Sequence, residues 1–242
     1  LDANTTANYN TAIGTKALTE NTTGHSNVAV GAFALDAATT ADTNTAVGVN
    51  ALTENTTGVK NTAVGYAAGD AITTGIDNVG VGYNAVGGVT TGNYNIGIGR
   101  NTLNTTNTAS NNVAIGYTAL ASTTAGNNTA IGHTAMVANT TGTENVAVGA
   151  VSLDANTTGQ DNTALGFAAL GTNTTGSSNT SLGAYSLDAA TTADSNTAVG
   201  RSALTASTTG NSNVAIGDYA MSAATTADRN VAVGSNAMAS LT

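Results

Sequence analysis

The apolar positions of this chain recur with a period of about seventeen residues. The segment Asn44–Gly48, with the sequence NTAVG, occurs with small variations fourteen times. Every step from one anchoring Asn to the next is seventeen residues, except the sixteen-residue step from Asn112 to Asn128. A strict repeat of this length over a whole chain predicts a solenoid, in which one structural rung stacks on the next.

Three columns of residues define the rung when each anchoring Asn is counted as position zero. The Asn residues are Asn10, Asn27, Asn44, Asn61, Asn78, Asn95, Asn112, Asn128, Asn145, Asn162, Asn179, Asn196, Asn213 and Asn230. Position three is aliphatic, with Ile13, Val30, Val47, Val64, Val81, Ile98, Ile115, Ile131, Val148, Leu165, Leu182, Val199, Ile216 and Val233. Position four is always Gly, with Gly14, Gly31, Gly48, Gly65, Gly82, Gly99, Gly116, Gly132, Gly149, Gly166, Gly183, Gly200, Gly217 and Gly234.

The segment that follows each Asn is typical of a short β-strand, because it has β-branched residues at alternating positions. Alternation places positions one and three on one face of the strand and position two, which is Ala, Gly or Ser, on the other. The Gly permits a turn or a positive φ. We expect a second short strand to carry the Leu or Met of position eight, and the Thr-Thr-Gly segments to close the rung as a polar turn. Two strands and two turns in seventeen residues predict a thin parallel β-roll, with room inside only for Ala, Val and Leu.

Composition narrows the possible functions. Only 8% of the residues are charged, and five Lys or Arg against fourteen Asp or Glu give a net charge of −9. This balance disfavours binding to nucleic acids and to anionic membranes. The chain has no Cys, which excludes disulfides and thiolate metal sites. No apolar run is long enough to insert into a membrane, and no signal peptide is present at the start.

The positions of the charged residues say more than their number. None falls at positions zero to four of any rung; they occur at positions five, six, nine and ten and in the closing turn, and Tyr and Phe also gather at positions five and six. The strand is therefore uncharged on both faces, and a thin coil can cover only one of them. We expect the other face to pack against further copies of the chain, about three in a closed arrangement without a free sheet edge. An exposed flat Thr face is the alternative.

The invariant Asn has a structural interpretation. Stacked rungs place identical side chains about 4.8 Å apart, where their amides can form a hydrogen-bonded ladder, and Asn also tolerates the turn that precedes a strand. Fourteen rungs at this spacing predict a rod about 65 Å long.

The strand motif, as in Asn112–Gly116 and Asn213–Gly217, resembles the head repeat of YadA-like trimeric autotransporter adhesins, and similar repeats occur in bacteriophage tail fibres. The resemblance covers essentially the whole chain. It implies a left-handed parallel β-roll, three chains side by side, an extracellular, cell-surface or virion location, and contact with host surfaces. The rung here is longer than the common one of that family, the Thr-Thr-Gly turns are not part of its motif, and no neck, stalk or anchor is present. The choice between adhesin and phage fibre therefore stays open.

Residues 1–242 are expected to form a single solenoid array. Leu1 enters a rung at position eight and Thr242 leaves one at position twelve, and neither end has a capping rung. We expect either a segment of a longer fibre or subunits that stack end to end into a filament.

No pattern in the sequence predicts catalysis, a cofactor or a metal site. His25 and His133 lie in different rungs without a partner pattern, and an exposed turn position is the expected place for both. Gly80–Gly82 and Gly97–Gly99 are short fragments of a phosphate-loop pattern, but no helix is expected after them. The turns that end in Asp42, Asp194 and Asp228 could offer oxygen ligands to calcium, yet the Asp column is broken, which favours solvated turns.

The repeated Thr-Thr pair supports one further hypothesis, an ice- or glycan-binding solenoid. Adjacent strand residues point in opposite directions, however, so a lattice-matching face would require Thr-x-Thr. Asn21, Asn55 and Asn139 match the N-glycosylation pattern, as expected from composition in so biased a repeat. The sequence thus predicts a structural or adhesive fibre segment with an unknown surface ligand, with the ice- or glycan-binding solenoid and the filament subunit as alternatives.

Overall fold

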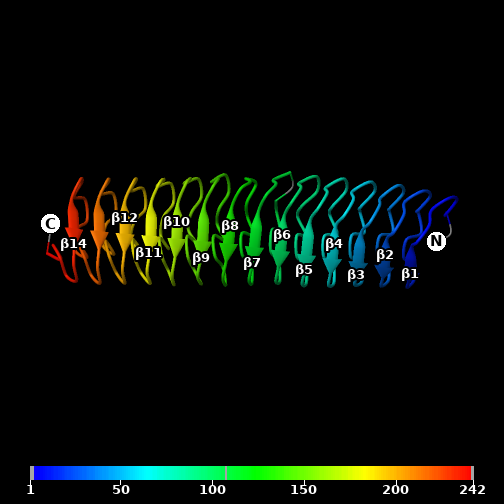
Figure 1. Ribbon diagram of the computed structural model, residues 1–242, viewed down its shortest axis with the longest axis horizontal. Coiled ribbons are helices and arrows are strands. Elements are labelled where there is room, and N and C mark those ends of the chain that lie inside the picture. The colour runs from blue at the N-terminus through cyan, green and yellow to red at the C-terminus, as the bar shows by residue number, and fades with distance from the viewer. Residues whose placement is uncertain (1–2, 107, 241–242) are drawn as a thin grey trace. The chain divides into compact units, whose positions relative to one another are not determined.

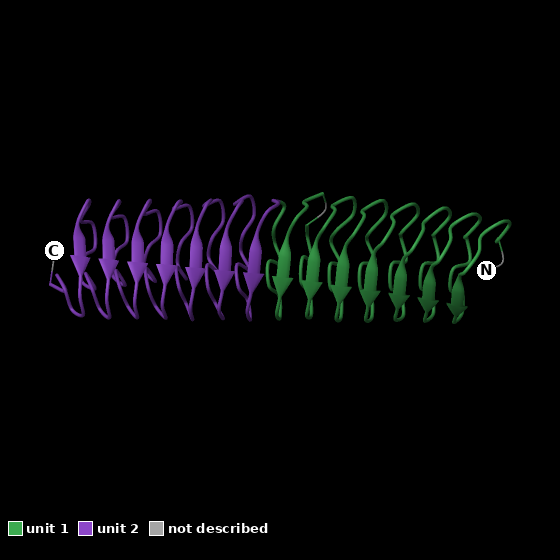
Figure 2. Ribbon diagram, viewed as in Figure 1, with its two compact units in different colours: residues 1–124 green, residues 125–242 purple. Residues whose placement is uncertain are grey.

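The computed structural model describes residues 3–106 and 108–240, and these residues contain strands and turns but no helix. The chain divides into two compact units, residues 1–124 and 125–242 (Figure 2). The boundary falls within the sixteen-residue step between Asn112 and Asn128, the one irregularity of the repeat.

Each rung contributes one strand of three residues, at positions one to three (Figure 1). The first unit contains β1 (Thr11–Ile13), β2 (Val28–Val30), β3 (Thr45–Val47), β4 (Thr62–Val64), β5 (Val79–Val81), β6 (Ile96–Ile98) and β7 (Val113–Ile115). The second unit contains β8 (Thr129–Ile131), β9 (Val146–Val148), β10 (Thr163–Leu165), β11 (Thr180–Leu182), β12 (Thr197–Val199), β13 (Val214–Ile216) and β14 (Val231–Val233).

Within each unit the strands pair in parallel with their sequence neighbours, and equivalent rung positions face each other. Thr45, Ala46 and Val47, for example, lie opposite the corresponding residues of β4. This register confirms the predicted all-β, parallel β-solenoid fold, in which each turn of the chain adds one strand to the sheet.

The interior is narrower than the sequence suggested. Position two points inward and is fully buried, as at Ala46, where it faces the buried Leu or Met of position eight. In the rung where position two is Gly80, Val86 takes the space of the missing methyl group, and an added Cβ would lie 2.5 Å from its Cγ2. Inside, Asn accompanies Ala and Leu, whereas the Val and Ile residues of position three lie outside the coil; Val enters the interior only at positions eight and eleven, as Val86 and Val89.

The predicted second strand does not form. Positions six and eight adopt left-handed backbone conformations instead, as at Asn50 (φ 59°) and Leu52 (φ 52°). The curled segment turns the Leu side chain into the interior, where Leu52 is completely buried, and its N–H donates to the carbonyl of Ala68 at 3.0 Å. A left-handed Leu costs about 1–2 kcal/mol, which is similar to what full burial of its side chain contributes, about 1.5–3 kcal/mol.

The closing turn is fixed from rung to rung through one carbonyl group. The carbonyl of Thr73 accepts hydrogen bonds from Thr56 N (2.9 Å), Thr57 N (3.3 Å) and Thr56 Oγ1 (3.2 Å). The first Thr of each pair is thereby held against the next rung, and the second points outward.

Candidate functional site

The anchoring Asn residues form a ladder inside the coil. In the first unit, Oδ1 of Asn44 accepts a hydrogen bond from the backbone N–H of Asn61 at 2.9 Å, and its Nδ2 donates to the Gly58 carbonyl at 2.9 Å and to Oδ1 of Asn27 at 3.2 Å. In the second unit, Oδ1 of Asn162 likewise accepts the backbone N–H of Asn179, and its Nδ2 donates to the Gly176 carbonyl and to Oδ1 of Asn145. Most of these side chains are fully buried. Their amides therefore supply the backbone groups with the hydrogen bonds that water would supply at an exposed turn.

A second, shorter Asn ladder lies at position eleven and was missed in the sequence. Nδ2 of Asn156 donates to Oδ1 of Asn139 at 2.9 Å, and Nδ2 of Asn173 donates to Oδ1 of Asn156 at 2.8 Å. All three are fully buried, as are Asn21 and Asn55, so these glycosylation-pattern residues are closed to modification in the folded chain. The signal was the pairing of Asn at position eleven with Gly at position fourteen. A Cβ on Gly176 would lie 2.5 Å from Oδ1 of Asn173.

The Gly residues of position four occupy a conformation that other residues rarely adopt. Their φ angles lie between 126° and 147°, as predicted from the invariant glycine. From Gly14 to Gly99 and from Gly132 to Gly217 they also lie directly against the next rung, whereas Gly234 does not; a Cβ on Gly48 would be 2.1 Å from the carbonyl oxygen of Gly65.

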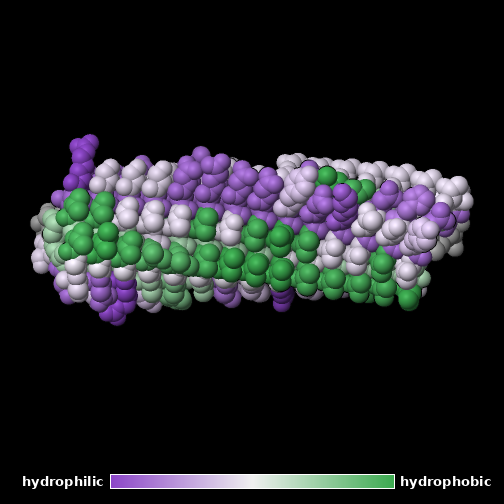
Figure 3. Space-filling view, viewed as in Figure 1, coloured by the Kyte–Doolittle hydropathy of each residue, from purple (hydrophilic) through white to green (hydrophobic). Residues whose placement is uncertain are grey.

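We call the outward side chains of positions one and three the strand face. It comprises Thr11, Ile13, Val28, Val30, Thr45, Val47, Thr62, Val64, Val79, Val81, Ile96, Ile98, Val113 and Ile115 in the first unit. In the second unit it comprises Thr129, Ile131, Val146, Val148, Thr163, Leu165, Thr180, Leu182, Thr197, Val199, Val214, Ile216, Val231 and Val233. None is charged, and all are at least partly exposed. Figure 3 shows apolar residues gathered over the strands, as these columns require. The aliphatic column of position three is therefore a surface feature of the chain.

The acidic turns have a structural role. The carboxylate of Asp42 accepts the backbone N–H of His25 at 2.6 Å, and Asp194 and Asp228 accept those of Ser177 and Asn211 at 2.7 and 2.6 Å. Nδ1 of His25 in turn accepts the N–H of Asn8 at 3.0 Å, which places the ring proton on Nε2. Among the residues that the structure describes, no three His, Cys, Asp or Glu side chains gather as a metal site would require.

The remaining sequence features receive structural explanations. A Cβ at Gly80 or Gly97 would clash with the β-branched Val86, and one at Gly97 would also clash with Thr102; no helix follows either glycine. His133 is exposed. The second Thr of each pair, as at Thr57 and Thr74, forms an exposed single file, which we call the Thr column; no described protein group bonds these two hydroxyls.

Aromatic and basic side chains stack along positions five and six. The rings of Tyr66 and Tyr83, each half-exposed, are parallel with centroids 5.3 Å apart, and the Arg100 guanidinium lies 5.3 Å from the centroid of Tyr83. Lys16 lies over Phe33 in the same way, at 5.5 Å. The positive charges of Lys16 and Arg100 are thus held over aromatic rings.

The carboxylates of Asp154 and Asp188, in the second unit, lie close to Gly171. A Cβ on Gly171 would lie 2.9 Å from Oδ1 of Asp188 and 3.5 Å from Oδ1 of Asp154. Partial burial raises the pKa of both carboxyls, and the charge of Asp188 raises the pKa of Asp154 further.

We expect Asp188→Asn to stabilise the chain at neutral pH, by about 0.5 kcal/mol because both groups stay partly exposed. Since the folded-state pKa is raised, the charged form is penalised in the folded state, and the native chain gains stability as pH falls through that pKa. The advantage of the variant should therefore be complete at neutral pH and absent below the ordinary aspartate pKa of about 3.9. Urea unfolding at both pH values measures it. The double variant with Asp154→Asn should gain less than the sum of the single changes, and equal gains at both pH values would contradict the explanation.

Comparison with protein-family models, curated proteins and solved structures finds no significant match to this chain. The described residues contain no helix long and apolar enough to cross a membrane. The geometry of the surfaces described above therefore carries the functional argument.

Proposed function

We propose that the chain is a structural and adhesive fibre segment whose copies associate side by side, as a homotrimer, through the strand face. One observation carries the proposal: in both units every rung presents two outward, uncharged and nearly always β-branched side chains at the strand. A continuous column of exposed aliphatic side chains, as at position three, is typical of a protein interface. β-Branched side chains also lose little rotamer freedom when they are buried.

The proposed mechanical role rests on the hydrogen bonds that connect successive rungs. Parallel backbone pairing, the Asn ladder and the carbonyl-centred Thr turns all join each rung to the next within a unit. A segment with such continuous bonding resists local opening, which suits a fibre that holds a binding surface away from its base. A left-handed coil and an extracellular, cell-surface or virion location belong to the same proposal, on the strength of the sequence resemblance. The role proposed is mechanical and adhesive, not enzymatic.

A lysine on the strand face is expected to prevent assembly. Val64 and Leu165 are exposed in the single chain, so Val64→Lys and Leu165→Lys should fold, but in the trimer each would bury an unpaired ammonium at a cost of about 3 kcal/mol or more per chain. Light scattering should give the mass of three chains for the native protein and of one chain for either variant.

Thr57→Lys is the matched control, because it places the same charge on the Thr column, away from the strand face, and should leave the trimer intact. A native protein that is monomeric at micromolar concentration would overturn the side-by-side association. A trimer that survives both strand-face variants would overturn the assigned interface.

Binding to an ordered lattice, ice or a glycan, is the second candidate function. It is favoured by the Thr column, whose side chains are exposed on a backbone fixed from rung to rung, with unbonded hydroxyls at Thr57 and Thr74. The Thr pair itself does not form a flat face, because its first hydroxyl is bonded to the next rung. Thermal hysteresis by the monomeric protein would favour this function over the fibre, and long filaments of the purified chain in electron micrographs would favour end-to-end assembly.

A further inference from the structure

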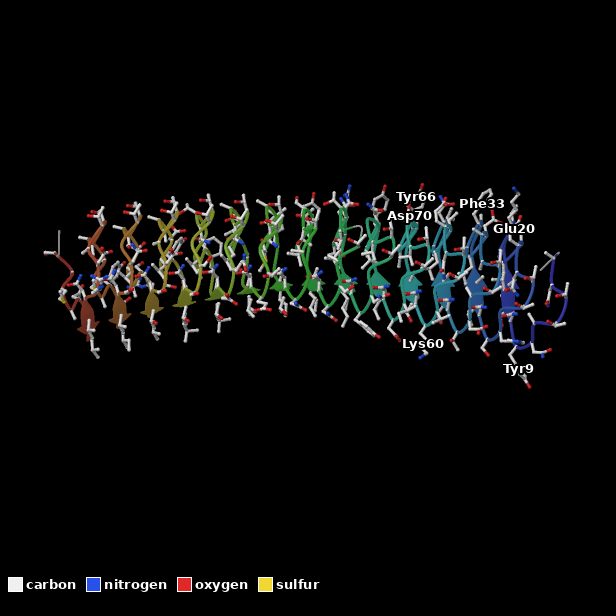
Figure 4. The ribbon with its side chains drawn as sticks, turned by 90° about the horizontal axis from the view of Figure 1, so that it is seen from above. Tyr9, Glu20, Phe33, Lys60, Tyr66 and Asp70 are labelled. Carbon is white, nitrogen blue, oxygen red and sulfur yellow. The ribbon has the colours of Figure 1, made fainter. Side chains whose placement is uncertain are left out.

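A shallow hollow of about 210 Å³ opens on the first unit, away from the strand face. It is lined by Asn50, Thr53, Glu54 and Asp70, which come from positions six to ten of two successive rungs. Figure 4 places Asp70 on the same side of the coil as Tyr66, Phe33 and Glu20, whereas Lys60 and Tyr9 lie on the opposite side. The hollow thus lies in the part of the rung that varies in sequence and that a side-by-side assembly leaves in water.

The hollow offers many acceptors and few donors. The two carboxylates of Glu54 and Asp70 only accept hydrogen bonds. The Thr53 hydroxyl already donates to the Phe33 carbonyl at 3.2 Å, so toward the hollow it also acts as an acceptor. The Asn50 amide supplies the donor of the lining. A complementary ligand must therefore bring donors of its own, as hydroxyl and ammonium groups do.

The charge of the hollow is not balanced by the protein. Among the described residues neither Glu54 nor Asp70 forms an ion pair, and Lys16 and Arg100, which belong to other rungs, lie over aromatic rings. Partial burial raises the pKa of Asp70, and the charge of Glu54 raises it further, although the Asp70 carboxylate accepts the N–H of Ala71. A cationic ligand would relieve this repulsion, whereas an anionic one would add to it.

An exposed aromatic ring, Tyr66, lies on the same side of the coil as Asp70, outside the four residues that line the hollow (Figure 4). One face of Tyr66 stacks on Tyr83 of the following rung. The equivalent residue of the preceding rung is Val49, which is also exposed. An exposed ring beside polar groups provides an apolar contact for the C–H groups of a small cyclic ligand.

We propose that this hollow binds an amino-sugar unit with a free, protonated amine, as part of a hydroxyl-rich oligosaccharide. Glu54 and Asp70 pair with the ammonium, Asn50 and Thr53 bond the hydroxyls, and Tyr66 packs against the sugar ring. The inference rests on the proposed adhesive function, for which it names the class of surface ligand.

Isothermal titration calorimetry of the native assembly with a glucosamine tetramer tests the proposal. The fully N-acetylated tetramer, which keeps the ring and loses the charge, should bind at least about tenfold more weakly. Glu54→Gln and Asp70→Asn should each weaken binding of the free-amine tetramer by about tenfold. Glu20→Gln is the matched control, because Glu20 lies on the same side of the coil outside the lining, and it should change the affinity less than about twofold.

Three results would overturn the site: no binding of the free-amine tetramer, equal binding of a tetralysine peptide, or equal losses in the Glu20 and Glu54 variants. The last two would show charge attraction without a sugar site. Light scattering on the same samples separates this failure from that of the fibre, because the hollow variants leave the strand face untouched and should keep the mass of the native assembly.

Discussion

Gly48→Ala is expected to destabilise the first unit by about 4 kcal/mol. The backbone at Gly48 has φ 144°, a conformation that an L-residue adopts only under strain. The added Cβ would also lie 2.1 Å from the carbonyl oxygen and 2.6 Å from the carbonyl carbon of Gly65. These atoms belong to the next rung, which is held by its own ladder, so neither side can yield without breaking pairing. Urea unfolding and amide exchange of β3 and β4 measure the loss.

Gly234→Ala separates the cost of the backbone conformation from the cost of the clash with the next rung. Gly234 has a similar φ of 127°, but the nearest atom to its added Cβ is Ala237 Cβ at 3.9 Å. Only the conformational cost remains there, about 1–2 kcal/mol. Equal losses at the two glycines would show that rung-to-rung contact contributes nothing, and that the sequence column reflects backbone conformation alone.

The sequence predicted the parts of the fold that depend on one residue type at one position. The Gly of position four indicated a positive φ, and β-branched residues around a tiny residue indicated the strand; both are confirmed. These features are local, and their repetition removed the ambiguity that a single copy would leave.

The sequence did not predict how the chain returns to the next strand. Leu at position eight was expected in a second strand, because left-handed Leu is disfavoured by its own conformational energy. The structure adopts that conformation at Leu52 and its equivalents because it brings the side chain into the interior and its N–H to the next rung. Such a preference arises from stacking of rungs and is not visible in one rung alone.

Of the candidate surfaces, one could be predicted from the sequence and the other could not. The uncharged strand face follows from counting charges by rung position. The hollow does not, because Asn50 and Asp70 lie twenty residues apart and meet only when two rungs are stacked. The Asn ladder at position eleven was hidden for another reason: Asn21 and Asn55 match a modification pattern, and only their burial shows that they are interior residues.

Asn44→Asp is expected to be more damaging than removing the side chain's hydrogen bonds alone would suggest, with a loss of about 4 kcal/mol or more at neutral pH. Asn44 is fully buried, and its Nδ2 faces two oxygens, the Gly58 carbonyl at 2.9 Å and Oδ1 of Asn27 at 3.2 Å. A carboxylate would place a third oxygen and a negative charge against both. Thermal and urea unfolding measure the effect.

The pH dependence of this variant tests whether charge or shape is responsible. Burial beside two acceptors should raise the pKa of the introduced carboxyl in the folded state. The folded variant then binds a proton more tightly than the unfolded chain, so its stability should rise as pH falls through the raised pKa toward about 3.9. The protonated acid can donate to the Gly58 carbonyl and still accept the N–H of Asn61, whose native distance is 2.9 Å. Asn104→Asp, at an exposed position, should change stability by less than about 0.5 kcal/mol at either pH. If Asn44→Asp lost the same stability at neutral pH and at about pH 3.9, the shape of the Asn side chain would be responsible. The order of donor and acceptor along the ladder would then be secondary.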